Sequence, residues 1–277
     1  MQRTPAGAAD HNVGRLGNRS MAKRPVAGHC VHCLQFHDEL TWDHVFPEAW
    51  YPETTPENTE KWKVPSCGPC NKDHGRNEAE LLMRFGLCVP PDQPSNMGIV
   101  DKALRALNPD AGKNARDAGA RASKRARILN QTFSGSDIPR QAIYPGFGPQ
   151  PEQAEADQVA VTISARGLKK FTEKVVRGLT YLEESKLIES THEIENFVVN
   201  EPGASEFRAA LDRFGTTHER LPGLRIRRAI IPEDRLSAIF EIEIWGQLKL
   251  YATVMPKNLE ADAQPGAAGD APQAARP

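Results

Sequence analysis

Residues 28–50 read GHCVHCLQFHDELTWDHVFPEAW and contain the two features from which the fold can be argued. Cys30 and Cys33 form a Cys-x-x-Cys pair, the spacing with which a tight turn presents two thiolates to one metal ion. Ten residues after Cys33 come Asp43 and His44, an acid and an imidazole side by side in an otherwise apolar stretch. The pair of cysteines alone predicts a metal-stabilised turn, whereas the Asp-His pair raises the question of an active site.

The stretch VPSCGPCNKDHG at 64–75 repeats the cysteine spacing with Cys67 and Cys70. Two such pairs supply four thiolates, the ligand set of a closed, structural Zn²⁺ site. We therefore expect zinc here, and no coordination position would remain for water or substrate. Two alternatives stay open: four cysteines without a metal, or replacement of one thiolate by His29 or His32.

The order of these motifs resembles the HNH endonucleases. That family has a cysteine knuckle, then Asp-His-x-x-Pro on a β-hairpin, then Cys-x-x-Cys-Asn at the start of a helix. The matching elements are CVHC (30–33), WDHVFP (42–47) and VPSCGPCN (64–71). The combination is more specific than Asp-His-x-x-Pro alone, and it covers residues 28–90, roughly a quarter of the chain. The resemblance implies a ββα core clamped by zinc.

The resemblance also implies hydrolysis of phosphodiester bonds in DNA. His44 would be the general base, because a neutral imidazole can accept a proton from water near neutral pH. Asp43 and the side-chain oxygen of Asn71 would bind one catalytic Mg²⁺ or Mn²⁺, since these hard cations prefer oxygen ligands. Neighbouring residues of a strand point to opposite faces, so a bend at 45–47 is expected if Asp43 and His44 serve one site.

The same residues could also have simpler, structural roles. Asp43 could cap a turn, His44 could be a packed histidine, and Asn71 could be the N-cap of the following helix. Three candidate phosphate contacts follow Asn71, although charged and histidine side chains are ordinary on an exposed first helical turn: Lys72, His74 and Arg76.

One family feature is missing. HNH sequences usually carry a central Asn nine residues before the final Asn or His, where it braces the loop behind the base. Trp62 occupies that position, and Asn58 is the nearest substitute. We expect aromatic packing to supply the bracing instead.

The whole chain predicts an α+β protein with a zinc-stapled HNH domain, a basic helical segment and a C-terminal mixed α/β domain of unknown role. Both ends are rich in polar residues, Pro, Gly and Ala, and cannot bury enough surface to order themselves. The expected segments are 1–27 (disordered), 28–93 (HNH), 94–135 (basic helical), 136–157 (linker), 158–256 (α/β) and 257–277 (disordered).

Hydrophobic periodicity predicts the elements of the second half. Leu168, Phe171, Val175, Leu179 and Leu182 recur at helical spacing. Further helices are expected over 76–87, 97–109 and 205–215, and strands over 159–163 and 192–200. Three stretches alternate apolar and polar residues with period two, which indicates a sheet with one buried face: 224–231, 238–244 and 248–254.

Charge is distributed unevenly, although the formal net charge is only −1. Residues 30–93 contain eleven acidic and five basic side chains, whereas residues 101–130 contain eight basic and three acidic ones. The basic segment is therefore the expected contact with DNA phosphates, with a solvated charged helix as the alternative.

Composition narrows the class of protein. No stretch has the ~18 to 20 apolar residues of a membrane span, and no apolar run follows the basic N-terminal residues as in a secretory signal. An odd count of five cysteines with two knuckles suits a reducing compartment. We expect a cytoplasmic, metal-dependent HNH endonuclease, a type found in restriction, phage defence and mobile elements. The alternative is a non-catalytic zinc-binding module that contacts nucleic acid or protein.

Overall fold

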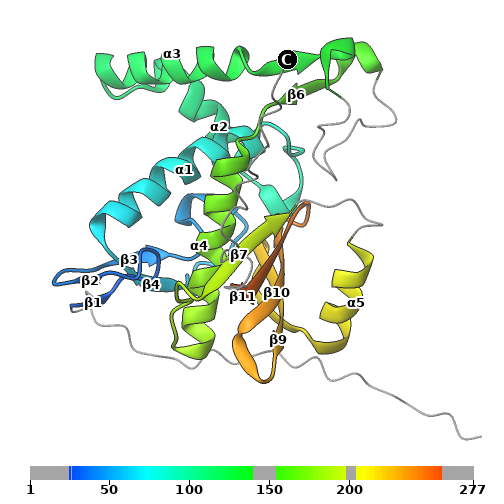
Figure 1. The fold of residues 1–277 in the computed structure, drawn as a ribbon. Coiled ribbons are helices and arrows are strands. Elements are labelled where there is room, and N and C mark those ends of the chain that lie inside the picture. Colours follow the sequence, from blue (N-terminus) through cyan, green and yellow to red (C-terminus); the bar gives the residue numbers. More distant parts are fainter. Residues whose placement is uncertain (1–24, 26, 140–153, 198–203, 258–277) are drawn as a thin grey trace, which may run out of the picture.

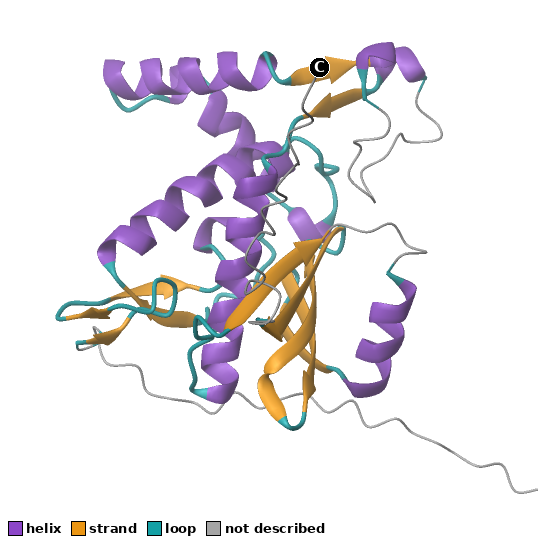
Figure 2. Cartoon of the chain, in the orientation of Figure 1, coloured by secondary structure: helices purple, strands orange, loops and turns teal. Residues whose placement is uncertain are grey.

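A computed structural model describes residues 25, 27–139, 154–197 and 204–257. The expected disordered ends lie almost entirely outside this range, as does most of the expected linker. The fold is mixed α/β, as the sequence predicts (Figures 1 and 2). No helix within the described ranges is both long and apolar enough to span a membrane.

The N-terminal part begins with short strands that lead into a long helix. Its elements are β1 (Gly28–His29), β2 (Phe36–His37), β3 (Thr41–His44), β4 (Lys63–Ser66) and α1 (Gly68–Gly86). β1 pairs antiparallel with β2, and β3 pairs antiparallel with β4. α1 begins earlier than the predicted helix, because Pro69 in the first turn costs no hydrogen bond there and Cys67 serves as an extended N-cap.

The basic segment is helical, as predicted, and carries a short sheet. Its elements are α2 (Ile99–Leu107), α3 (Ala115–Leu129), β5 (Thr132–Ser134) and β6 (Val159–Val161). α2 packs closely on α1, where a Cβ on Gly86 would lie 2.7 Å from the Cβ of Ala103. α3 buries only Ile128 and lies away from the large sheet (Figure 1). It therefore presents most of its basic side chains to solvent.

The C-terminal part is one antiparallel sheet between two helices. Its elements are α4 (Ala165–Glu184), β7 (His192–Phe197), α5 (Ser205–Phe214), β8 (Thr216–Arg220), β9 (Leu224–Ile231), β10 (Asp234–Ile244) and β11 (Leu248–Pro256). The strand order is β7-β11-β10-β9-β8.

The predicted alternation in β9, β10 and β11 is confirmed. Leu224 and Ile226 face the core with Phe240, whereas Arg227 and Glu241 pair on the opposite face at 2.8 Å. α4 packs on the apolar face, and α5 covers the polar face through contacts with β9 and β10. The polar face is thus held by ion pairs and the other face by hydrophobic burial.

One hydrophobic core joins the expected HNH segment to the C-terminal sheet. Trp50 is 1% exposed and stacks on Phe171 of α4, with ring centroids 4.7 Å apart. The indole Nε1 of Trp245, in the turn after β10, donates to the backbone oxygen of Trp50 at 2.8 Å. The segment boundaries stay a prediction, but residues 28–93 and 158–256 contribute to the same core.

A buried histidine at the edge of the sheet gives a testable pH dependence. Burial first, and then the nearby guanidinium of Arg228, lower the pKa of His218 to about 4. Glu183 Oε1 lies 3.4 Å from His218 Nδ1 without a hydrogen bond, so it does not hold the charged form. The folded protein therefore keeps His218 neutral.

Because the unfolded chain protonates His218 at about pH 6.5 and the folded one only near pH 4, this residue contributes stability above pH 6.5. The contribution is lost as the pH falls from 6.5 to 4, and amounts to on the order of 3 kcal/mol. We expect the difference in unfolding free energy between wild type and His218→Gln to shrink over this range. A difference that stays constant with pH would contradict the assignment.

Candidate metal centre and adjoining ion cluster

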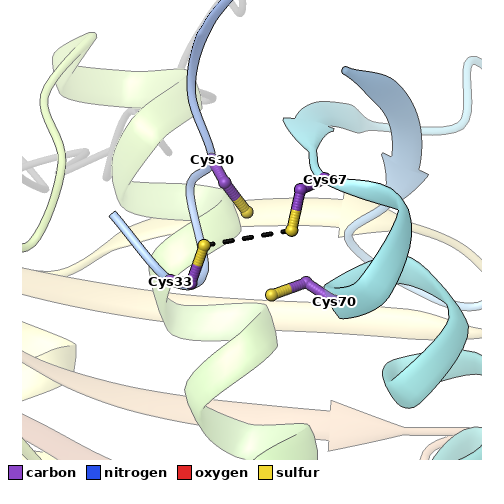
Figure 3. A group of neighbouring side chains, drawn as sticks. All are labelled: Cys30, Cys33, Cys67 and Cys70. Carbon is purple, nitrogen blue, oxygen red and sulfur yellow. Dashed lines mark hydrogen bonds between the residues drawn. The ribbon is translucent and has the colours of Figure 1, made fainter. Parts of the chain in front are cut away.

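The four predicted cysteines come together. Their Sγ atoms all lie within 4.8 Å of one another. Cys33 Sγ and Cys67 Sγ are 3.9 Å apart, close to the edge of about 3.8 Å that a tetrahedron of four sulfurs would have around Zn²⁺. Figure 3 shows Cys30 and Cys33 from the β1–β2 turn facing Cys67 and Cys70 from the start of α1. The cluster could hold a metal ion such as zinc.

The surroundings of the thiols favour metal binding. Burial raises the pKa of Cys30, but the backbone amides of Cys33 and Cys67 outweigh it and lower the value to about 7. Burial and the neighbouring thiols raise the pKa of Cys70. A divalent cation would relieve this mutual repulsion by keeping all four groups as thiolates, which is the form that binds zinc.

The histidines next to the cluster make other contacts. His29 Nδ1 lies 2.9 Å from the backbone oxygen of Leu34, and His32 Nε2 lies 3.0 Å from Asp43 Oδ2. Neither ring therefore replaces a thiolate in this arrangement. His37 Nε2 lies 3.5 Å from Cys33 Sγ, a contact that could not be predicted from the sequence because His37 belongs to neither cysteine pair nor the Asp-His motif.

Asp43 lies in a buried ion cluster and not in an open site. It is 5% exposed, and its two carboxylate oxygens contact His32 Nε2 at 3.0 Å and Lys174 Nζ at 2.9 Å. Burial raises the pKa of Asp43, but His32 and the Lys174 ammonium outweigh it and hold the pKa below its usual value. Lys174 lies on α4, is 1% exposed, and also contacts Glu78. Burial raises the pKa of Glu78.

His74 is buried beside this cluster, not solvated on the helix surface. Its ring lies 4.4 Å from that of His32, centroid to centroid. Burial first, and then the neighbouring His32, lower the pKa of His74 to about 3. The imidazole is therefore neutral and keeps one N–H donor.

Asn71 lies in the first turn of α1 against β3. Its Nδ2 donates to Thr41 Oγ1 at 3.0 Å and to the Trp42 backbone oxygen at 3.3 Å. It is not the N-cap, which is Cys67. Thr41 and Asp43 share one face of β3, so Asn71 and Asp43 lie on the same side of the strand. The Asn71 Oδ1 atom accepts no hydrogen bond from any residue that the structure describes.

His44 is the half-buried last residue of β3 and lies on the opposite face of the pleat from Asp43. Burial lowers the pKa of His44, and Lys63 on the paired strand lowers it further. The structure thus brings Asp43 and Asn71 to one face and places His44 at the strand end, before the turn at Pro47. The imidazole is neutral at physiological pH.

The remaining predicted residues are peripheral or structural. Lys72 and Arg76 are exposed on α1, and Arg76 pairs with Asp73 at 3.1 Å. Trp62, at the position of the family's central Asn, is buried, and its backbone oxygen accepts from Val45 N at 2.9 Å. That bond braces the chain directly after His44, whereas Asn58 is exposed.

Comparison with protein-family models, curated proteins and solved structures gave no match to this chain. The interpretation of the site therefore rests on the residues and their geometry.

Proposed function

We propose that the protein is a metal-dependent HNH-type endonuclease that hydrolyses phosphodiester bonds of DNA. One observation carries the proposal: an antiparallel strand pair followed by a helix is clamped by four cysteines, with Asn71 of the helix bonded to β3 at Trp42, next to Asp43. This is the arrangement that the resemblance to the HNH endonucleases implies. It supports the assignment of Asp43, His44 and Asn71 as catalytic residues.

The protonation states of these residues suit the proposed roles. His44, neutral because burial lowers its pKa, can accept the proton of an attacking water. Asp43 is ionised, and Asn71 has a free Oδ1, so both offer oxygen ligands for Mg²⁺ or Mn²⁺, which would neutralise charge on the phosphate. Because His32 and Lys174 contact both Asp43 oxygens, an ion at Asp43 requires the Lys174 ammonium to withdraw.

The alternative function is a non-catalytic zinc-binding module that contacts nucleic acid or protein. The Lys174 ammonium favours it, because the protein already supplies a cation to Asp43 and Glu78. In that case DNA would bind without being cut, and substitution of His44 would leave function unchanged.

Plasmid cleavage with Mg²⁺ or Mn²⁺ separates the two functions. We expect His44→Ala to reduce the nicking rate by about 100-fold or more, since general-base catalysis contributes about 10² to 10⁴. Asn71→Ala should also abolish most nicking, while both variants keep the metal content of wild type. His192→Ala is the matched control, because this histidine pairs with Asp234 on the distant sheet. Equal nicking by all four proteins would point to a contaminating nuclease and reject the proposal.

A further inference from the structure

A cavity of about 400 Å³ lies beside the cysteine cluster, between α4 and the start of α1. Cys33 and Cys70 line one side of it, and Figure 3 shows α4, in pale green, running behind the cysteines. α4 contributes a row of basic side chains along one face: Arg166, Lys169, Lys170, Lys174 and Arg177. We call this space the α4 cavity.

The α4 cavity carries an excess of positive charge. Five basic side chains line it against two acidic ones, Asp73 and Glu173, and one of the five, Lys174, is already paired with Asp43 and Glu78. Lys170 pairs with Asp73, whereas Lys169 is 3.9 Å from Glu173 and both ends of that pair are partly exposed. Arg166 is exposed and makes no ion pair with any described residue. Arg166 and Lys169 are therefore available to an anionic ligand.

Two histidines line the cavity, and one of them has a buried ring nitrogen without a partner. His74 is 8% exposed and forms no hydrogen bond within the described part of the chain, so its ring is open to a ligand from the cavity. His32 also lines the cavity, and its buried Nδ1 has no hydrogen-bond partner. Buried polar atoms are nearly always paired in folded proteins, so the unpaired Nδ1 of His32 beside a cavity points to a ligand.

The basic row fits an extended polyanion better than a single small anion. From Arg166 to Arg177 a helix rises about 16 Å, which equals the axial length of roughly five phosphates of one DNA strand. Part of the positive charge also offsets the cysteine cluster, because four thiolates around a divalent ion carry a net charge of −2. Neutralising the thiolates does not explain why the cavity is open or why the ring of His74 has no hydrogen-bond partner among the described residues.

We propose that the α4 cavity binds backbone phosphates of DNA, with Arg166 and Lys169 contacting phosphate oxygens and His74 donating a hydrogen bond. The proposal rests on the proposed endonuclease function and assigns its substrate contact to the C-terminal part of the chain. Of the phosphate contacts expected from the sequence on α1, His74 lies at this cavity, whereas Lys72 and Arg76 do not line it. Lys174 lines the cavity and contacts Asp43, so phosphates bound along α4 would lie next to the proposed metal ligand Asp43.

The test is binding of a fluorescently labelled DNA duplex by the full chain without added Mg²⁺ or Mn²⁺, at several salt concentrations. The test variant is Arg166→Gln/Lys169→Gln, and both residues are exposed, so folding should not change. The control is Lys186→Gln/Arg213→Gln, which removes the same charge from exposed positions outside the cavity. Metal content and thermal unfolding are measured on each protein.

We expect the test variant to bind roughly tenfold more weakly, with a salt slope smaller in magnitude by about 2, since each lost phosphate contact reduces it by about 0.9. The control should stay within about twofold of wild type. Equal weakening in both variants, an unchanged salt slope, or loss of metal from the test variant would overturn the proposal. If the test variant binds DNA more weakly but wild type does not cleave DNA with Mg²⁺, the endonuclease function is rejected and the DNA-binding role of the α4 cavity is supported. If wild type cleaves DNA but the test variant binds as tightly as wild type, the role of the α4 cavity is rejected and the endonuclease function is supported.

Discussion

Substitution of Cys67 by serine is expected to abolish metal binding at the four-cysteine cluster and to unfold the N-terminal part of the protein. Cys67 is 2% exposed and joins β4 to α1, so it is both a candidate metal ligand and the N-cap of the helix. A serine hydroxyl is not ionised at neutral pH and is a poor zinc ligand. Structural zinc contributes about 10 to 16 kcal/mol in small zinc domains, which is comparable to the whole stability of a typical protein.

The measurements are metal stoichiometry of the purified protein and thermal unfolding before and after chelator treatment. Cys88→Ser is the matched control, because Cys88 lies outside the cluster after α1. We expect Cys88→Ser to keep the bound metal and to change stability by about 1 kcal/mol or less. A Cys67→Ser protein with wild-type metal content and unfolding temperature would show that the cluster is not a metal site.

Substitution of Lys174 by methionine is the second large effect that we expect. The side chain is 1% exposed, and its ammonium contacts both Asp43 and Glu78. Methionine preserves most of the volume but leaves two buried carboxylates without their cation. Removing one partner of a buried ion pair costs about 3 to 5 kcal/mol, because the remaining charge is uncompensated.

Urea unfolding of Lys174→Met should show this loss, and Lys170→Met is its control on the same helix. Lys170 pairs with Asp73 near the surface, where an ion pair is worth at most about 1 kcal/mol. Adding Glu78→Gln to Lys174→Met should recover part of the stability, since one of the two stranded carboxylates is then neutral. Equal destabilisation by both lysine substitutions would mean that the buried cluster contributes no more than a surface pair.

Stabilisation of Lys174→Met by Mn²⁺, but not of wild type, would link the buried ion cluster to the proposed metal site at Asp43. It would show that a divalent ion can take the place of the ammonium at Asp43. An unchanged unfolding midpoint with Mn²⁺ would favour the non-catalytic alternative, in which Lys174 is a permanent part of the core.

Local patterns predicted the parts of the fold that depend on neighbours in sequence. Alternation predicted β9 to β11, helical spacing predicted α4, and the spacing of the paired cysteines predicted the four-cysteine cluster. β8 was missed because its sequence TTHER has no apolar alternation; it is an edge strand placed by pairing with β9. Edge strands of this kind are defined by tertiary contacts, not by intrinsic preference.

The ion cluster could not be predicted for a related reason. Lys174 and Asp43 are 131 residues apart, and a lysine on an amphipathic helix is typically solvated. His74 was likewise expected on an exposed face, whereas His32 covers it and Lys174 of α4 lies close by. The cysteines converge because each pair has a fixed local spacing, but nothing local relates α4 to β3.

The stacking of Trp50 on Phe171 and its bond to Trp245 has a practical consequence for dissecting the protein. A fragment that stops at residue 135 would leave Trp50 and Phe46 facing water, because the helix and sheet that cover them come later in the chain. Truncation would therefore expose an apolar surface and favour aggregation of the N-terminal fragment. Any exchange or shortening of the C-terminal half would have to preserve the aromatic residues against which the N-terminal half packs.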